Sequence, residues 1–149
     1  MKAVLQRVKN ASVTVNDGLY SEINGGLLIF LGIEKGDDEE KLDWMVKKVL
    51  ALRIFEDDDN KMNKSLMDIN GDILVVSQFT LAADCKKGTR PSFDSAEIPA
   101  VAEDMYEKFI KKLKSEVKES KLNIKTGVFG AMMEVKLCND GPVTIILEK

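Results

Sequence analysis

The hydroxyl groups best placed to do chemistry lie in a short stretch, "SQFTL", at residues 77–81. It follows an apolar run that predicts a buried strand, and functional groups are common where a rigid strand gives way to a loop. Thr80 could attack an ester and form an acyl-enzyme. The 149 residues contain no histidine, however, which excludes Ser-His-Asp and Cys-His catalysis. Catalysis must therefore come from hydroxyls, carboxylates, lysines, backbone amides or the substrate itself.

A second stretch, "NDGPVT" at residues 139–144, places Gly141 and Pro142 between two strand-like runs, "MMEVKLC" and "VTIILE". Proline cannot donate a hydrogen bond to a sheet, so it is tolerated only at the first residue of a strand, at an edge or at a bulge. The pair predicts either a hairpin turn between two strands or a rigid loop that touches a ligand.

Composition excludes several kinds of metal site. The absence of histidine removes His-containing zinc sites, and two distant cysteines, Cys85 and Cys138, cannot form a four-cysteine site. The acidic run Asp57–Asp59 lacks the glycine and the closing glutamate of a calcium loop. We therefore predict neither a metal nor a cofactor.

The net charge of −3 predicts no general attraction to nucleic acid, which would need a local basic patch. The candidate patch is Lys86, Lys87 and Arg90, aided by the lysines of the second helix, although helical lysines are more often a solvated face. No apolar run approaches the roughly 20 residues that span a membrane, and two lone cysteines favour a reducing compartment. We predict a cytoplasmic protein without a membrane segment.

Hydrophobic periodicity predicts the first elements. Alternation over residues 2–15 indicates a half-buried strand, "NDG" at 16–18 indicates a hairpin into "LYSEI", and the apolar run 25–33 indicates a strand buried on both faces. Asp37 with Glu40 resembles a helix cap. The helix that follows has apolar residues at helical spacing, namely Leu42, Met45, Val46, Val49 and Leu50.

The rest of the chain adds loops, a second helix and more strands. Residues 56–66 and 82–99 are polar or rich in turn formers and predict loops. The second amphipathic helix is marked by Val101, Met105, Tyr106, Phe109, Ile110, Leu113 and Val117. The sum is one mixed α/β domain over residues 1–149, with two main helices packed on a largely antiparallel, barrel-like sheet.

Six stretches, taken together, closely resemble the bacterial and eukaryotic D-aminoacyl-tRNA deacylase family. They run from the first residues to the last strand: "AVLQRV", "RIFED", "SQFTL", "RPSF", "GVFGAMMEV" and "NDGPVT". The resemblance implies a homodimer that hydrolyses the ester between a D-amino acid, or glycine, and the terminal adenosine of tRNA. It also implies that the Gly-Pro peptide bond is cis and that this pair enters the active site of the other subunit.

The resemblance also implies roles for individual residues. Gly141 and Pro142 would form a wall that rejects L side chains, and Arg7 would brace it. The terminal adenosine would be held by Phe129, Gly130, Ala131 and Met133. For a tRNA substrate, the basic patch identified above from charge, Lys86, Lys87 and Arg90, is the expected contact surface.

The catalytic segment in this resemblance is Ser77, Gln78, Phe79 and Thr80, and it can work in two ways. Thr80 could be the nucleophile. Alternatively, backbone amides around Phe79 and Thr80 could form an oxyanion hole while Ser77 and Thr80 orient the ester. We favour the second mechanism because no base is available to activate the threonine.

Two other functions are less consistent with these motifs. One is a related enzyme that removes an L-amino acid from tRNA, with a trans Gly-Pro bond and with proline and alanine in place of Ser77 and Phe79. The other is a non-catalytic, nucleic-acid-binding dimer. Neither needs both "SQFTL" and "NDGPVT" intact, as they are in this chain.

Overall fold

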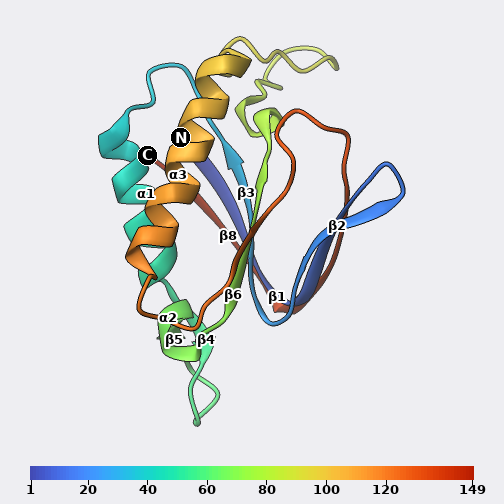
Figure 1. Ribbon diagram of the computed structural model, residues 1–149. Helices are drawn as coiled ribbons and strands as arrows, with labels where there is room; N and C mark the ends of the chain where they lie inside the picture. Colours follow the sequence, from blue (N-terminus) through green and yellow to red (C-terminus); the bar gives the residue numbers. More distant parts are fainter.

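The computed structural model describes residues 1–149 and centres on a six-stranded mixed sheet (Figure 1). Strand β1 (Lys2–Val15) is its organising element. On one edge its first half pairs with β3 (Gly26–Gly32) and its second half with β2 (Gly18–Ile23). On the other edge it pairs along most of its length with β8 (Glu134–Glu148). All three pairings are antiparallel.

The sheet continues from β3 through two parallel pairings, to β6 (Asp72–Ser77) and then to β7 (Ile124–Thr126). The Ser21 hydroxyl on β2 donates to the Thr126 carbonyl on β7 over 2.8 Å, which brings the two ends of this path together. The sheet is therefore nearly closed. The predicted mixed fold with a barrel-like sheet is confirmed.

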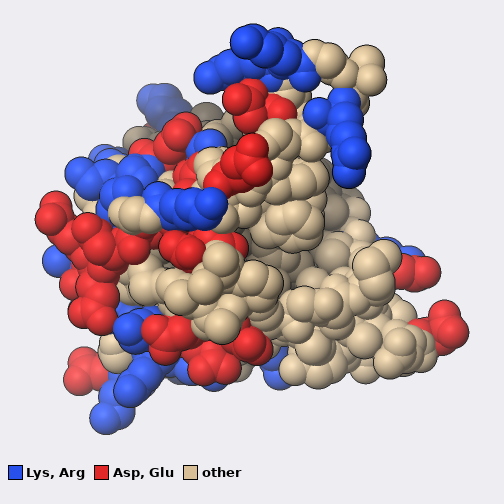
Figure 2. All heavy atoms as spheres, turned by 90° about the horizontal axis from the view of Figure 1, so that it is seen from above, with Lys and Arg blue, Asp and Glu red and all other residues tan.

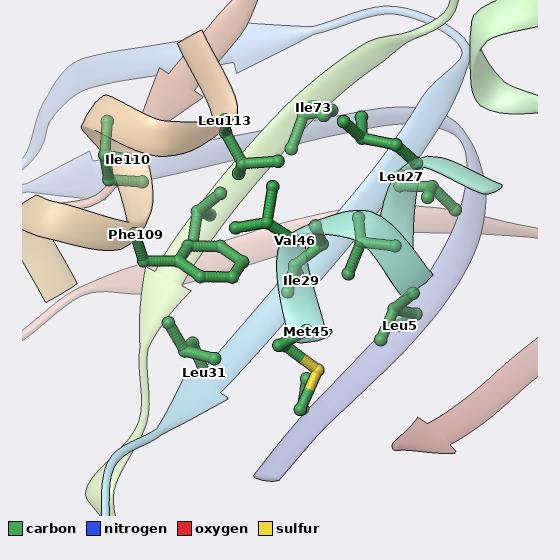
Figure 3. Packing of buried hydrophobic residues seen from close by; sticks show 14 of the residues in the cluster. Leu5, Leu27, Ile29, Leu31, Met45, Val46, Ile73, Phe109, Ile110 and Leu113 are labelled. Atoms are coloured by element: carbon green, nitrogen blue, oxygen red, sulfur yellow. The ribbon is translucent and has the colours of Figure 1, made fainter. Parts of the chain in front are cut away.

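Two long helices, α1 (Glu39–Ala51) and α3 (Pro99–Glu116), cover one face of the sheet (Figure 1). All five apolar residues predicted for the first helix are buried. Side chains from both helices interleave with those of the strands (Figure 3), for example Met45 and Phe109 with Ile29. Each such side chain contributes about 1.5–3 kcal/mol when buried, so this layer fixes the helices on the sheet. No helix is long and apolar enough to cross a membrane.

Two details of the predicted helices are wrong. The cap of α1 is Asp38, whose carboxylate accepts from the Lys41 amide over 2.9 Å. Asp37 instead accepts from the Glu34 amide and from the N-terminal ammonium of Met1. On α3, Val101 is exposed, whereas Ala102 in the same turn is buried, so the apolar face of the helix begins at Ala102 (Figure 1 shows the helix).

The stretch 56–66, predicted as a loop, is largely a hairpin. Strands β4 (Arg53–Glu56) and β5 (Met62–Ser65) pair in it and lead into the short helix α2 (Leu66–Ile69). The Asp57 carboxylate caps the turn by accepting from the Asn63 side chain and two backbone amides, and the Asn63 bond is the main cause of a lowered Asp57 pKa. The acidic run is thus part of a turn.

The C-terminal stretch is one strand instead of the two that the Gly-Pro pair suggested. Thr144 lies opposite Gln6, and Asn139 lies opposite Val8. The four residues 140–143 therefore lie opposite a single residue of β1, Arg7, and do not pair with it. We call residues 140–143 the Gly-Pro bulge. A hairpin turn would reverse the chain, whereas here β8 continues along the same edge of β1 on both sides of the bulge.

Candidate active site

A large apolar cavity opens where the parallel strands β3 and β6 end. Its volume is about 770 Å³, and 15 of its 21 lining residues are hydrophobic. Strand β6 contributes Val76 and Ser77, helix α3 contributes Tyr106, and the link between β7 and β8 contributes residues 129–133. Three predicted catalytic residues line the cavity, Ser77, Gln78 and Phe79, and so do all four predicted adenosine-binding residues, Phe129, Gly130, Ala131 and Met133.

The "SQFTL" segment turns sharply at the cavity. The Gln78 amide still pairs with the Leu31 carbonyl at 2.8 Å, and the chain then forms a short 3₁₀-helix, η1 (Phe79–Ala82). Gly32 allows this close approach, because a Cβ there would lie 3.0 Å from the Gln78 oxygen and from Leu81 Cβ. The glycine therefore brings η1 against the end of β3.

The side chains of this segment differ in position. Phe79 is 59% exposed and packs edge-to-face on Phe93, with ring centroids 5.1 Å apart. The Thr80 hydroxyl donates to the Gln78 side-chain oxygen over 2.7 Å, and Thr80 is not among the residues that line the cavity. Its hydroxyl is therefore engaged with a neighbour, away from the cavity wall.

Two backbone amides are available at the same place. The hydrogen bonds of η1 begin with the Leu81 amide to the Gln78 carbonyl at 3.3 Å. The amides of Phe79 and Thr80 precede that bond, and the first amides of a helix have no partner within it. The Phe79 amide belongs to a residue that lines the cavity, and the Thr80 amide follows it directly in the chain.

The link before β8 forms the opposite wall. The Phe129 ring lies against Tyr106 with centroids 5.8 Å apart. The Met133 sulfur accepts from the Val128 amide at 3.3 Å and lies against Gly127, where a Cβ would be 2.7 Å from it. Met133 therefore holds the link in shape as well as lining the cavity.

The cavity holds few charged groups. Only Lys35 and Glu97 are charged among its lining residues, and the Glu97 carboxylate accepts from the Ile98 amide at 2.8 Å. The Tyr106 hydroxyl donates to the Val75 carbonyl at 2.8 Å, and burial, with a smaller effect of Tyr20, raises the pKa of Tyr106 above its usual range. The site therefore resembles a shaped apolar pocket with backbone donors more than an acid–base centre.

Sequence reasoning did not place Lys35, Phe93, Glu97 or Tyr106 in the site. Lys35 follows β3, Phe93 and Glu97 come from the 83–98 loop, and Tyr106 belongs to α3, where helical periodicity explains it as core. No local signal identifies them, because the cavity is assembled from segments far apart in the chain.

The other predicted motif lies around Arg7, the only buried residue with a charged side chain, at 5% exposure. Its guanidinium donates to the Ile54 carbonyl at 2.8 Å and to the Asp140 carbonyl at 3.3 Å. It also pairs with the Asp140 and Glu56 carboxylates at 3.1 and 3.4 Å. A buried charge is stable only when it is paired in this way, so Arg7 anchors the base of the bulge.

Gly141 and Pro142 form the exposed tip of the bulge, and the peptide bond between them is cis. Gly141 has a φ of +110°, and a Cβ there would lie 2.8 Å from Arg7 Nη2. Any side chain at this position would be strained and would press on the anchoring arginine.

Within one chain the two motifs lie at opposite ends of the sheet. Arg7 and Asp140 line a second cavity, of about 490 Å³, with Gly26 and Gly71 at the starts of β3 and β6. The apolar cavity lies at Leu31 and Ser77, where those strands end. Five residues of strand separate the two ends, or about 17 Å.

The predicted tRNA-contacting residues Lys86, Lys87 and Arg90 lie exposed on the 83–98 loop and form no ion pair. In Figure 2, seen from above, basic side chains gather at one edge of a broad uncharged surface that is hollowed near its centre. On α3, by contrast, Lys108 and Lys112 are paired with acidic side chains. Those helical lysines thus belong to a solvated, ion-paired face.

The sequence matches a known protein family along almost its whole length. A model of the family described as D-Tyr-tRNA(Tyr) deacylase matches residues 4–148. The chain belongs to this family. The family resemblance predicted from the sequence is confirmed, and with it the prediction of an enzyme, a deacylase.

Individual relatives of this deacylase family cover nearly the whole chain. The chain is 53% identical to a D-aminoacyl-tRNA deacylase of Syntrophus aciditrophicus and 54% identical to one of Aquifex aeolicus, each over 99% of this chain and 97% of the relative. A solved structure of a c-Myc DNA unwinding element binding protein is 46% identical, with a TM-score of 0.93, and covers 100% of this chain and 99% of that one. A probable eukaryotic D-amino acid tRNA deacylase has the same fold, with a TM-score of 0.80 at 19% identity over 98% and 97% of the two chains.

Proposed function

We propose that this protein hydrolyses the ester between a D-amino acid, or glycine, and tRNA, and that it rejects L-aminoacyl-tRNA. The observation that carries the proposal is the apolar cavity formed by residues 77–79 and 129–133 in a chain of the deacylase family. Its aromatic and thioether walls suit the ring of a terminal adenosine. Such a reaction recycles mischarged tRNA and belongs in the cytoplasm.

The active site is completed by a second copy of the chain. The base of the Gly-Pro bulge, at Arg7 and Asp140, and the apolar cavity of the same chain lie at opposite ends of β3 and β6, about 17 Å of strand apart. In a homodimer, the exposed tip of one bulge enters the cavity of the partner. Its rigid backbone leaves room for the hydrogen on the α-carbon of the substrate but not for an L side chain in that place. The site is therefore strict for chirality and tolerant of side-chain identity.

Catalysis relies on backbone donors instead of a nucleophile. The amides of Phe79 and Thr80 stabilise the oxyanion as water attacks the ester, and Ser77, Gln78 and Thr80 orient the groups around it. The hydroxyl of Thr80 is bonded to Gln78 and has no base beside it, which supports an orienting role. The substrate's own ribose 2′-hydroxyl assists the water, and the reaction needs no metal or cofactor.

Lys86, Lys87 and Arg90 form the tRNA-contacting surface. They carry unpaired positive charge on the 83–98 loop, whose Phe93 and Glu97 line the cavity. Contacts to phosphates do not depend on sequence, so one enzyme can serve many tRNAs.

A second candidate function is nucleic-acid binding without hydrolysis. The likeness to the c-Myc DNA unwinding element binding protein favours it, and the same basic loop would serve. The acidic net charge of −3 limits such binding to that loop.

The deciding experiment is single-turnover release of tyrosine from D-Tyr-tRNA and L-Tyr-tRNA, side by side, with a metal chelator present. We expect rapid loss of the D ester alone. Loss of both esters would contradict the chiral filter, and loss of neither would leave the binding function as the better account.

A further inference from the structure

The break in the β1–β8 ladder leaves main-chain groups without their usual partners. Opposite the four-residue bulge, Arg7 has no ladder neighbour on β8, although it pairs with Leu27 of β3, and Val143 returns to the strand beside it. A buried or half-buried carbonyl without a donor is costly, so such groups are normally paired. These main-chain groups must therefore form hydrogen bonds to partners outside the ladder.

Asn139 does this with one side-chain amide. Its Nδ2 donates to the Arg7 carbonyl at 2.9 Å and to the Val143 carbonyl at 3.0 Å. These two oxygens belong to the two sides of the gap, one on β1 and one at the far end of the bulge. The amide thus bridges the base of the bulge, where the ladder is interrupted.

The other end of this amide is also held. The Thr144 hydroxyl donates to Asn139 Oδ1 at 3.5 Å, and the Gln6 side chain donates to that hydroxyl at 3.3 Å. These contacts fix which way the amide points, with its nitrogen toward the two carbonyls. Arg7 anchors the start of the bulge at Asp140, whereas Asn139 ties its start to its end.

We propose that Asn139 is a positioning residue that sets the place of the Gly-Pro tip, and thereby the selectivity for D over L esters. The proposal rests on the proposed function, in which the tip acts as the chiral filter. Asn139 itself does not contact the substrate. Its two hydrogen bonds close the base of the bulge, so that the tip keeps one position relative to β1.

The test is the ratio of the deacylation rates on D-Tyr-tRNA and L-Tyr-tRNA. Asn139→Ala removes both bridging bonds, and loss of even one hydrogen bond of about 1.4 kcal/mol corresponds to a fall of about tenfold in this ratio. Asn139→Asp should lower the ratio further, because a carboxylate oxygen would face two carbonyl oxygens. Of the contacts that Asn139 makes, Thr144→Val removes only the hydrogen bond to Asn139 Oδ1, and it should lower the ratio least.

Val49→Ala is the matched control for stability. It removes buried volume in α1, none of whose residues lines either cavity, and should lower the melting temperature without changing the D:L ratio. If Asn139→Ala and Thr144→Val lower the melting temperature and leave the ratio at the wild-type value, Asn139 is merely structural and the proposal is wrong. A wild-type protein with no D preference would instead contradict the proposed function.

Discussion

The two ends of strands β3 and β6 are built on different physical principles. At the carboxyl ends, the cavity is apolar, is formed by segments from four parts of the chain, and offers backbone amides in place of titrating groups. At the amino ends, the Gly-Pro bulge is held by polar contacts, with Arg7, Lys9 and Asn139 forming five hydrogen bonds or ion pairs around it.

This difference suggests a division of work. An apolar cavity tolerates substrates of varied shape, because dispersion and hydrophobic contacts are not directional. A bulge held by directional bonds from both sides keeps one shape, which is the property a steric filter needs. The proposed enzyme thus places the chemistry at one end and the discrimination at the other, and dimerisation brings the two together.

The largest effect should come from removing a backbone donor at the cavity end. Phe79→Pro deletes the Phe79 N–H, and proline is well tolerated as the first residue of a helix. Compared with Phe79→Ala, which loses the same ring but keeps the amide, we expect the rate on D-Tyr-tRNA to fall by about 10²–10³. Equal single-turnover rates for the two variants would show that this amide is not part of an oxyanion hole.

The bulge end should be nearly as sensitive. Gly141→Val places a side chain at a φ of +110° and 2.8 Å from Arg7 Nη2, which displaces the tip. A displacement of about 1 Å in a catalytic arrangement can cost about 10² in rate, so we expect a loss of this size on the D ester. Circular dichroism and a melting curve should show a folded protein, since the substitution lies on an exposed tip.

Mixing these two variants tests whether the ends meet across a dimer. In a randomly reassociated mixture of Phe79→Pro and Gly141→Val subunits, half of the dimers are mixed, and each mixed dimer has one intact site. About a quarter of the wild-type activity should return, because a two-fold interface pairs the same surfaces on both subunits. A mixture as inactive as its components would place each bulge at the cavity of its own chain.

A smaller effect is expected at Thr80, where the two catalytic mechanisms diverge. If the hydroxyl only orients Gln78 through its 2.7 Å bond, Thr80→Ala costs about tenfold in single-turnover rate, equivalent to about 1.4 kcal/mol. Thr80→Ser keeps the hydroxyl and should be close to wild type. A Thr80→Ala protein reduced to the uncatalysed rate, together with a trapped acyl-enzyme in the wild type, would instead identify Thr80 as the nucleophile.

Local patterns in the sequence predicted most strands and both long helices, because periodicity reflects which face of an element is buried. They failed where the answer depends on a distant partner. Gly141–Pro142 resembles a turn when only the local sequence is considered. In the structure, β8 pairs with β1 on both sides of it, so the segment is a bulge. Asp37 resembles a helix cap in the sequence, but in the structure its carboxylate accepts from the N-terminal ammonium of Met1.

The candidate site shows the same limit more sharply. The resemblance assigned Ser77 and Gly141 to one active site, and the structure places them at opposite ends of the sheet within one chain. Periodicity cannot show this separation, since it describes each element alone and not how the strands are arranged in the sheet. Tyr106 was predicted as an ordinary residue of a helix core, and only the assembled fold shows that its ring also lines the cavity.

Tyr106 offers the mildest test, because it asks whether the buried phenol takes part in catalysis. Tyr106→Phe should leave the deacylation rate and its pH profile unchanged and should cost about 0.5–1.5 kcal/mol in stability. The cost stays small because the Val75 carbonyl, which the hydroxyl contacts, still accepts from the Gly127 amide at 2.8 Å. A pH profile that shifts in this variant would give the phenol a role in catalysis and would weaken the contrast between the two ends.

The same residue predicts how stability depends on pH. Burial raises the pKa of Tyr106 in the folded state, so the unfolded chain loses the phenolic proton first, near pH 10. The stability that the buried, protonated phenol contributes is complete below that pH and declines above it, by about 1.4 kcal/mol per pH unit. Urea unfolding between pH 9 and 11, in roughly half-unit steps, should show this extra decline in the wild type and not in Tyr106→Phe. Parallel curves for the two proteins would mean that the phenol is as accessible to water as in the unfolded chain.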